Sequence, residues 1–161
     1  MKRLTLIRHA HADDKPPGGS DFDRPLSTRG LREAGALARY LLDRALVPDL
    51  LIASTARRTQ QTAEILTQVL ALPAQRVQPA QHLYVASAEV LLRAVRDVQP
   101  DVAHLAIVAH NPGVSDLMHA LLPEDVEIGE LVTAGACTLT FEVSSWSDLR
   151  SSATGYASYP G

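Results

Sequence analysis

Cysteine, aromatic residues and long apolar runs are all scarce in this sequence of 161 residues. The one cysteine, Cys137, has no partner for a disulfide within the chain, and its apolar surroundings predict a small buried side chain. Aromatic residues make up 4% of the chain, so leucine, valine and alanine must fill the core. A chain without an internal disulfide is typical of a reducing compartment, and we predict a cytoplasmic protein.

No apolar run approaches the roughly 18 residues that a membrane span needs. The run that follows Met1-Lys2-Arg3 stops after four residues, and no small-residue cleavage site follows it, so we expect no secretory signal. The net charge is −3, which lacks the positive excess that nucleic-acid binding requires. We therefore expect neither a membrane nor a nucleic acid as partner, whereas a local basic pocket for one small anion is compatible with this charge.

The sequence does contain an alternation of strand and helix patterns, which we interpret as one domain over residues 1–161. Short apolar runs predict buried strands at 4–7, 50–53 and 104–109, a short strand near Val77, and a last strand at 136–143, for which a sheet edge is one option. Helices are predicted from Ser27 or Thr28 to about Ala45, from a cap at Ser54 through Leu70, from Ala88 to Val98 behind Ser87, and after an Asn111 cap with Pro112 in the first turn. The first helix has its predicted core-facing positions at Leu31, Ala34, Leu37, Ala38, Leu41, Leu42 and Ala45.

Two stretches show neither a helix nor a strand pattern. Residues 12–25 are polar and rich in glycine and proline, which predicts a long surface loop of the kind that is often functional. The polar stretch from Ser144 onward is expected to lie over the surface or to fray.

Strands that alternate with helices predict an α/β fold with a mostly parallel central sheet and helices on both faces. In such sheets ligands bind beyond the carboxyl ends of the strands. Arg8 and His9 follow the first strand, Arg58 lies in the helix after the second, and His110 follows the 104–109 strand. We expect these four side chains to meet in one crevice.

The helix after the second strand has Arg57 and Arg58 in its first turn, where the helix dipole disfavours cations. An anion bound at that end would remove the conflict, because helix N-termini with arginine nearby make good phosphate sites. An alternative stays open for one of these two arginines: its side chain could point into water at little cost in free energy.

Two arginines and two histidines at one site suit phosphoryl transfer, which needs positioning and neutralisation of the phosphoryl oxygens. One histidine would be the nucleophile. Neighbouring positive charges would keep its attacking nitrogen unprotonated near neutral pH, and a backbone carbonyl or similar acceptor would orient its other nitrogen.

Three segments together resemble the signatures of the histidine phosphatase superfamily, which has the phosphoglycerate-mutase-like fold. They are Arg8-His9-Ala10, the stretch Ser-Thr-Ala-Arg-Arg-Thr-Gln-Gln-Thr-Ala at 54–63, and His110-Asn111-Pro112-Gly113. The short length, the stretch Arg-Pro-Leu-Ser-Thr-Arg-Gly at 24–30 and Leu83-Tyr84 are similar to its SixA-like phosphohistidine phosphatase branch. The resemblance covers nearly the whole chain and implies a three-layer α/β sandwich.

The same resemblance implies roles for the four site residues. His9 would be the phosphorylated nucleophile, Arg8 and Arg58 would clamp the phosphoryl group, and His110 would assist through charge and hydrogen bonding. Arg58 rather than Arg57 matches the motif, since it lies four residues after Ser54.

Further expectations concern the substrate. Arg24 and Asn111 are expected to bind it as well, although a solvated loop arginine is an equal alternative for Arg24. The expected partner is a phosphorylated protein or small phosphorylated molecule, handled by a monomer without metal or other cofactor. His104 and His119 are expected to pack or to face solvent.

The chain also departs from the family pattern. Ala10 stands where glycine is most common, which is tolerable if the backbone there is not left-handed. The region around residues 81–83 lacks an obvious carboxylate to act as general acid, and Glu89, Asp13 and Asp14 are unproven substitutes. An easily displaced leaving group such as the imidazole of phosphohistidine needs less general acid, which favours phosphohistidine over sugar phosphates.

Two other interpretations stay open. His9, His11 and Asp13 with a distant His110 could ligate zinc or manganese in a metal-dependent hydrolase, although neighbouring arginines disfavour a bare cation. Alternatively, the chain could be a module of the same fold that binds phosphate or a phosphoprotein without turnover. The role of His11 is open in every interpretation.

Overall fold

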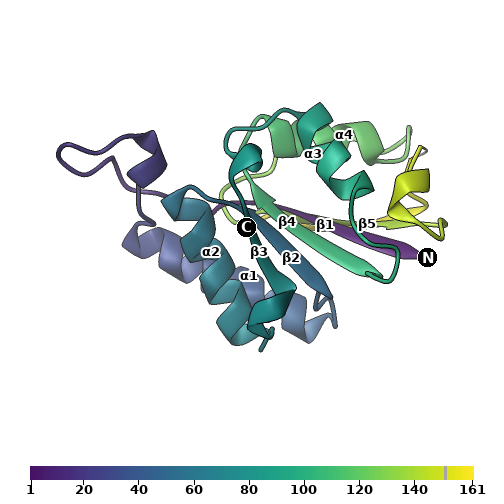
Figure 1. The fold of residues 1–161 in the computed structure, drawn as a ribbon, viewed down its shortest axis with the longest axis horizontal. Coiled ribbons are helices and arrows are strands. Elements are labelled where there is room, and N and C mark those ends of the chain that lie inside the picture. The colour runs from purple at the N-terminus through teal and green to yellow at the C-terminus, as the bar shows by residue number, and fades with distance from the viewer. Residues whose placement is uncertain (151) are drawn as a thin grey trace.

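The computed structural model describes residues 1–150 and 152–161, which form a six-stranded sheet between two layers of helices (Figure 1). The strands are β1 (Lys2–Arg8), β2 (Leu50–Ser54), β3 (Val77–Ala80), β4 (His104–Ala109), β5 (Ala136–Phe141) and β6 (Gly155–Tyr159). The helices are α1 (Thr28–Asp43), α2 (Arg57–Val69), α3 (Ala88–Arg96) and α4 (Gly113–Leu121). Short 3-10 turns lie at η1 (Asp21–Asp23), η2 (Ala74–Arg76), η3 (Gln81–Leu83) and η4 (Trp146–Asp148).

The strand order across the sheet is β3-β2-β4-β1-β5-β6. The first four strands in this order pair in parallel, and β5 runs antiparallel to both β1 and β6. The predicted α/β sandwich with a mostly parallel sheet is therefore confirmed. Strands β1 and β4 are neighbours in a register that pairs Arg8 with Ala109, so His9 and His110 leave the sheet side by side.

The two faces of the sheet carry separate hydrophobic clusters. Helices α1 and α2 cover one face, and α3 and α4 cover the other (Figure 1). Successive residues of β4 alternate between the clusters, because side chains along a strand point to opposite faces: Leu105 and Ile107 pack toward α3 and α4, Ala106 and Val108 toward α1 and α2. Among the described residues, no helix combines the length and the apolar character that a membrane span requires.

Serine caps begin two of the helices as the sequence predicts. The Ser27 hydroxyl accepts from the Gly30 amide at 3.0 Å at the start of α1, and the Ser87 hydroxyl accepts from the Val90 amide at 3.3 Å at the start of α3. Gly30 is required there because a Cβ atom would lie 2.0 Å from the His11 carbonyl oxygen. The beginning of α1 is thus packed directly against the chain that leaves β1.

The caps predicted at Ser54 and Asn111 are wrong. Ser54 is the last residue of β2, and α2 begins at Arg57 without a side-chain cap. Pro112, rather than Asn111, is the residue before α4. Both polar side chains are engaged elsewhere, in contacts that belong to the site described below.

The apolar stripe of α1 is narrower than predicted. Ala34, Leu37, Ala38 and Leu41 are buried, whereas Leu31 and Leu42 are 48% and 47% exposed. Ala45 lies beyond the end of the helix with a φ of 54°.

The C-terminal prediction is also wrong, because β5 is not an edge strand and the chain after it is ordered into η4 and β6. Trp146 holds the returning chain: its side chain is fully buried, and its indole nitrogen donates to the Val102 carbonyl at 2.8 Å. β6 then completes the sheet along β5. Residue 151, which falls in this stretch, lies outside the described residues.

Candidate active site

His9 follows β1 with one ring nitrogen tied to the backbone. Its Nδ1 lies 2.8 Å from the carbonyl oxygen of Ala10, and because a carbonyl can only accept, Nδ1 carries the proton. Nε2 is therefore left with its lone pair. Burial first, and then the charges of Arg58, Arg8 and Arg24, lower the pKa of His9 from 6.5 to about 4, although the bond to Ala10 raises it. The ring is neutral at physiological pH.

Arg58 joins the strand ends into one network. Its buried guanidinium donates from Nε to His9 Nε2 at 3.3 Å and from a terminal nitrogen to His110 Nδ1 at 3.2 Å. The same group donates to the backbone oxygen of Asp21 at 2.7 Å and to its carboxylate at 3.0 Å. Arg57, by contrast, is exposed, so the alternative of a side chain pointing into water holds for Arg57 and not for Arg58.

His110 follows β4 and is held as a specific neutral tautomer. A guanidinium can only donate, so His110 Nδ1 accepts from Arg58, and the proton sits on Nε2. Nε2 then donates to the Ser54 hydroxyl at 2.7 Å, which explains why Ser54 does not cap α2. Burial, and next the charge of Arg58, lower the pKa of His110 to about 3. Its ring lies 5.4 Å from that of His9, centroid to centroid.

Arg8 and Asn111 donate to the same backbone carbonyl. The carbonyl oxygen of Leu131 accepts from Arg8 at 3.2 Å and from the Asn111 amide at 2.9 Å. The Asn111 side-chain oxygen accepts from Ser115 at 2.6 Å, so both ends of its amide bond to protein atoms. Arg8 Nε, in contrast, is buried without a hydrogen-bond partner among the described residues. An unmet buried donor costs about 1–3 kcal/mol, and a bound oxyanion would satisfy it.

Arg24 and Asp21 from the 12–25 loop and Tyr84 after η3 complete the network, and sequence reasoning missed Asp21 and Tyr84 as site residues. Arg24 donates to the Asp13 carbonyl at 2.9 Å and to the Asp21 carboxylate at 3.3 Å. The Tyr84 hydroxyl donates to the same carboxylate at 2.6 Å. The Tyr84 bond is the main cause that lowers the pKa of Asp21 from 3.8 to about 2, with Arg24 and Arg58 adding to it. The only signal for Asp21 in the sequence is its place three residues before Arg24 in a long polar loop.

Several candidates are not brought into the site. His11 turns its Nδ1 to the Ser27 hydroxyl at 2.7 Å and so supports the start of α1. Asp13 and Asp14 are exposed, and Glu89 pairs with Arg93 on the outside of α3. In residues 1–150 and 152–161, no three side chains of His, Cys, Asp or Glu come together in a way that could hold a metal ion, so the alternative metal site is not formed.

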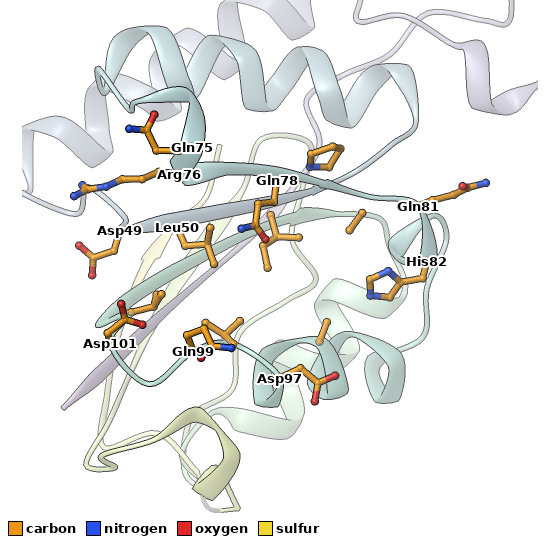
Figure 2. A pocket seen from close by; sticks show the side chains of 16 residues that line it. Asp49, Leu50, Gln75, Arg76, Gln78, Gln81, His82, Asp97, Gln99 and Asp101 are labelled. Carbon is orange, nitrogen blue, oxygen red and sulfur yellow. The ribbon is translucent and has the colours of Figure 1, made fainter.

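A groove of about 870 Å³ lies elsewhere on the molecule. It lies between β3 and the end of α3, with Gln78 on one side and Asp97 and Gln99 on the other (Figure 2). None of Arg8, His9, Arg58 or His110 lines it. This groove therefore does not coincide with the cluster of arginine and histidine side chains.

Comparisons with known proteins agree with this geometry. The profile of the histidine phosphatase superfamily, branch 1, matches residues 4–81. A protein of Agrobacterium tumefaciens assigned as the phosphohistidine phosphatase SixA is 31% identical in sequence, with a TM-score of 0.78 over 86% of this chain and 90% of that one. The chain belongs to the histidine phosphatase superfamily. The predicted resemblance to the family, including its SixA-like branch, is therefore confirmed.

Two further relatives widen the comparison. An uncharacterized protein of Mycobacterium tuberculosis is 34% identical over 111 residues, which are 69% of this chain and 66% of that relative. The protein histidine phosphatase SixA complexed with tungstate shares the fold at a TM-score of 0.75 and 23% identity, over 86% of this chain and 87% of that one. Membership of the histidine phosphatase superfamily and the likeness to SixA support a phosphatase.

The departure from the family at Ala10 has a simple structural account. Ala10 is fully buried, and its backbone does not adopt the left-handed conformation that would require glycine. Its amide donates to the Thr62 hydroxyl of α2 at 3.0 Å, and its carbonyl orients His9. An alanine methyl group is therefore accommodated beside His9 without backbone strain.

Proposed function

We propose that this chain is a metal-independent phosphatase that works through a phosphohistidine on His9. Its preferred substrate is phosphohistidine in proteins or another labile small phosphoryl compound. The observation that carries the proposal is the state of His9: Nδ1–H is held by the Ala10 carbonyl, and Nε2 keeps a lone pair beside the Arg58 guanidinium. A neutral, oriented imidazole next to cationic donors is what nucleophilic attack on a phosphoryl group requires.

In the first step His9 Nε2 attacks phosphorus as the bond to the leaving group breaks. Arg58 shifts its Nε–H from His9 to a phosphoryl oxygen, and the unpartnered Nε–H of Arg8 supplies a second donor. The phosphorylated ring of His9 is cationic, because the Ala10 carbonyl keeps the proton on Nδ1. His110 is neutral and is held by its bond to Ser54, so it helps to position Arg58 and adds no charge of its own.

In the second step water attacks phosphorus and His9 leaves as neutral imidazole. The phosphoryl group takes up the water oxygen, both water protons leave with the product as dihydrogen phosphate, and Nδ1 keeps its proton throughout. No acid is needed for this departure, since the leaving nitrogen of a ring protonated on its other nitrogen departs uncharged. The cycle returns His9 to its starting tautomer.

The same reasoning supports phosphohistidine as the substrate. Its imidazole, protonated on the far nitrogen, leaves without a proton donor, whereas the alkoxide of a sugar phosphate requires one. The carboxylate in contact with the site, Asp21, has its pKa lowered to about 2 and is an anion at neutral pH. Tyr84 has its pKa raised, chiefly by its bond to Asp21. Neither group is tuned to donate a proton near pH 7.

The test is turnover of a phosphohistidine peptide and of p-nitrophenyl phosphate in EDTA, with an assay for acid-labile phosphate on the protein. The wild type should turn over both compounds and trap phosphate, and His9→Ala should lose turnover by a factor on the order of 10⁴ and trap none. His119→Ala is the matched control, because His119 is exposed and its one side-chain hydrogen bond among the described residues is to the Ile128 carbonyl. Activity that disappears in EDTA would point to a metal-dependent hydrolase, and phosphate binding without turnover would point to a binding module.

A further inference from the structure

Four of the five N–H groups of the Arg58 guanidinium donate to protein groups. Its three nitrogens donate to His9, to His110 and to both the backbone and the carboxylate of Asp21. A phosphoryl group that takes two bonds from Arg58 must replace at least one of these contacts. The proposed mechanism already moves the Nε–H away from His9, and His110 lies at a fixed strand end, so the contact with Asp21 is the further one that can be exchanged.

The Asp21 carboxylate is held as a bound oxyanion would be. Arg58 and Arg24 form ion pairs with it at 3.0 and 3.3 Å, and Tyr84 donates to it at 2.6 Å. The carboxylate comes from outside the strand ends, on a loop, and half of its side-chain surface faces solvent. We propose that Asp21 is an internal anion that occupies the arginines of the site and is displaced when a phosphoryl group binds.

The 12–25 loop has the construction that such an exchange needs. Its base is fixed where Ala12 pairs with Leu26 and where the Asp13 amide donates to the Pro25 carbonyl. Its middle carries Gly18 with a φ of 74°, and this part of the chain projects from the body of the molecule, drawn in dark purple in Figure 1. Asp21 can therefore leave the site while both ends of the loop stay in place.

The phosphoryl group can displace the Asp21 carboxylate from the arginines because it carries more negative charge and more oxygen atoms. A phosphoryl dianion with three oxygens can bond Arg8, Arg58 and Arg24 together, whereas the carboxylate reaches only Arg58 and Arg24. The inorganic phosphate released in turnover is a weaker competitor when it carries a single negative charge. Asp21 then returns to the arginines and promotes product release, so it sets how tightly the site retains phosphate.

This inference takes the ligand class from the proposed function, and it is tested by binding rather than by turnover. Titration calorimetry with inorganic phosphate compares the wild type with Asp21→Asn, which keeps an oxygen acceptor and removes the competing charge. We expect Asp21→Asn to bind phosphate about fivefold to tenfold more tightly. Tyr84→Phe, which removes the shortest bond to Asp21, should shift affinity in the same direction and by less.

Asp14→Asn is the matched control. Asp14 lies in the same loop, is exposed, and forms no ion pair among the described residues, so the substitution changes net charge equally without touching the site. Equal affinities in Asp21→Asn and Asp14→Asn, or weaker binding in Asp21→Asn, would overturn the role of Asp21 and leave the phosphatase proposal standing. Failure of every protein to bind phosphate would overturn both.

Discussion

Strand β4 carries a buried histidine at each end: His104 is its first residue, and His110 follows its last. Burial is the first cause that lowers the pKa of both, to about 4 for His104 and about 3 for His110. Each also lies near an arginine, Arg3 for His104 and Arg58 for His110. By composition and pKa alone, the two ends of the strand are alike.

The hydrogen bonds around the two histidines differ. His104 Nε2 pairs with the Thr5 hydroxyl at 2.7 Å, and that hydroxyl meets Thr138 at 2.8 Å. The neighbouring Lys2 donates to the backbone carbonyls of Pro100 and Val102. At the other end, Arg8 Nε has no partner among the described residues, and Arg58 bonds a carboxylate from a loop. A lowered histidine pKa therefore does not distinguish the two ends of the strand, whereas the hydrogen-bond partners of the neighbouring cations do.

The largest effect is expected when the arginine beside His110, at the carboxyl end of β4, is replaced by another cation. Arg58→Lys should lower kcat/KM for p-nitrophenyl phosphate on the order of 10²-fold, because one ammonium cannot bond His9, His110 and the phosphoryl oxygens together. Arg57→Lys, at an exposed neighbouring position, should leave kcat/KM unchanged. Equal losses in the two variants would contradict the role given to Arg58.

A second test uses pH and treats both ends together. His9, His104 and His110 have folded-state pKa values below their ordinary 6.5, so the unfolded chain binds more protons in that range. The free energy of unfolding should be constant above about pH 6.5 and fall as the pH is lowered toward 4. Urea titrations across this range measure it. Stability that stays flat from pH 7 to 4 would show that these rings are not held neutral.

The smallest effect on activity is expected at the amino end of β4. His104→Ala should lower the free energy of unfolding by roughly 1–2 kcal/mol, because it removes a buried hydrogen bond to Thr5 and leaves a small cavity. It should leave kcat/KM unchanged and make the loss of stability in acid shallower. A drop in kcat/KM comparable with that of Arg58→Lys would remove the distinction between the two ends of the strand.

Local pattern in the sequence determined most of the architecture. The apolar runs at 4–7, 50–53 and 104–109 lie within β1, β2 and β4, and the serines before α1 and α3 cap them as expected. These features depend on neighbours within a few residues, which a sequence displays directly. The convergence of Arg8, His9, Arg58 and His110 also followed, because carboxyl ends of parallel strands meet at one edge.

What only the tertiary structure decided is which polar groups are partners across long separations. Ser54 bonds His110 instead of capping α2, Asn111 holds the carbonyl beside Arg8, and Asp21 reaches Arg58 and Tyr84. Each hydroxyl, amide or carboxylate has several acceptable partners, and the choice depends on distances set by packing. A side chain's residue type fixes what it can donate or accept, and the fold determines to whom.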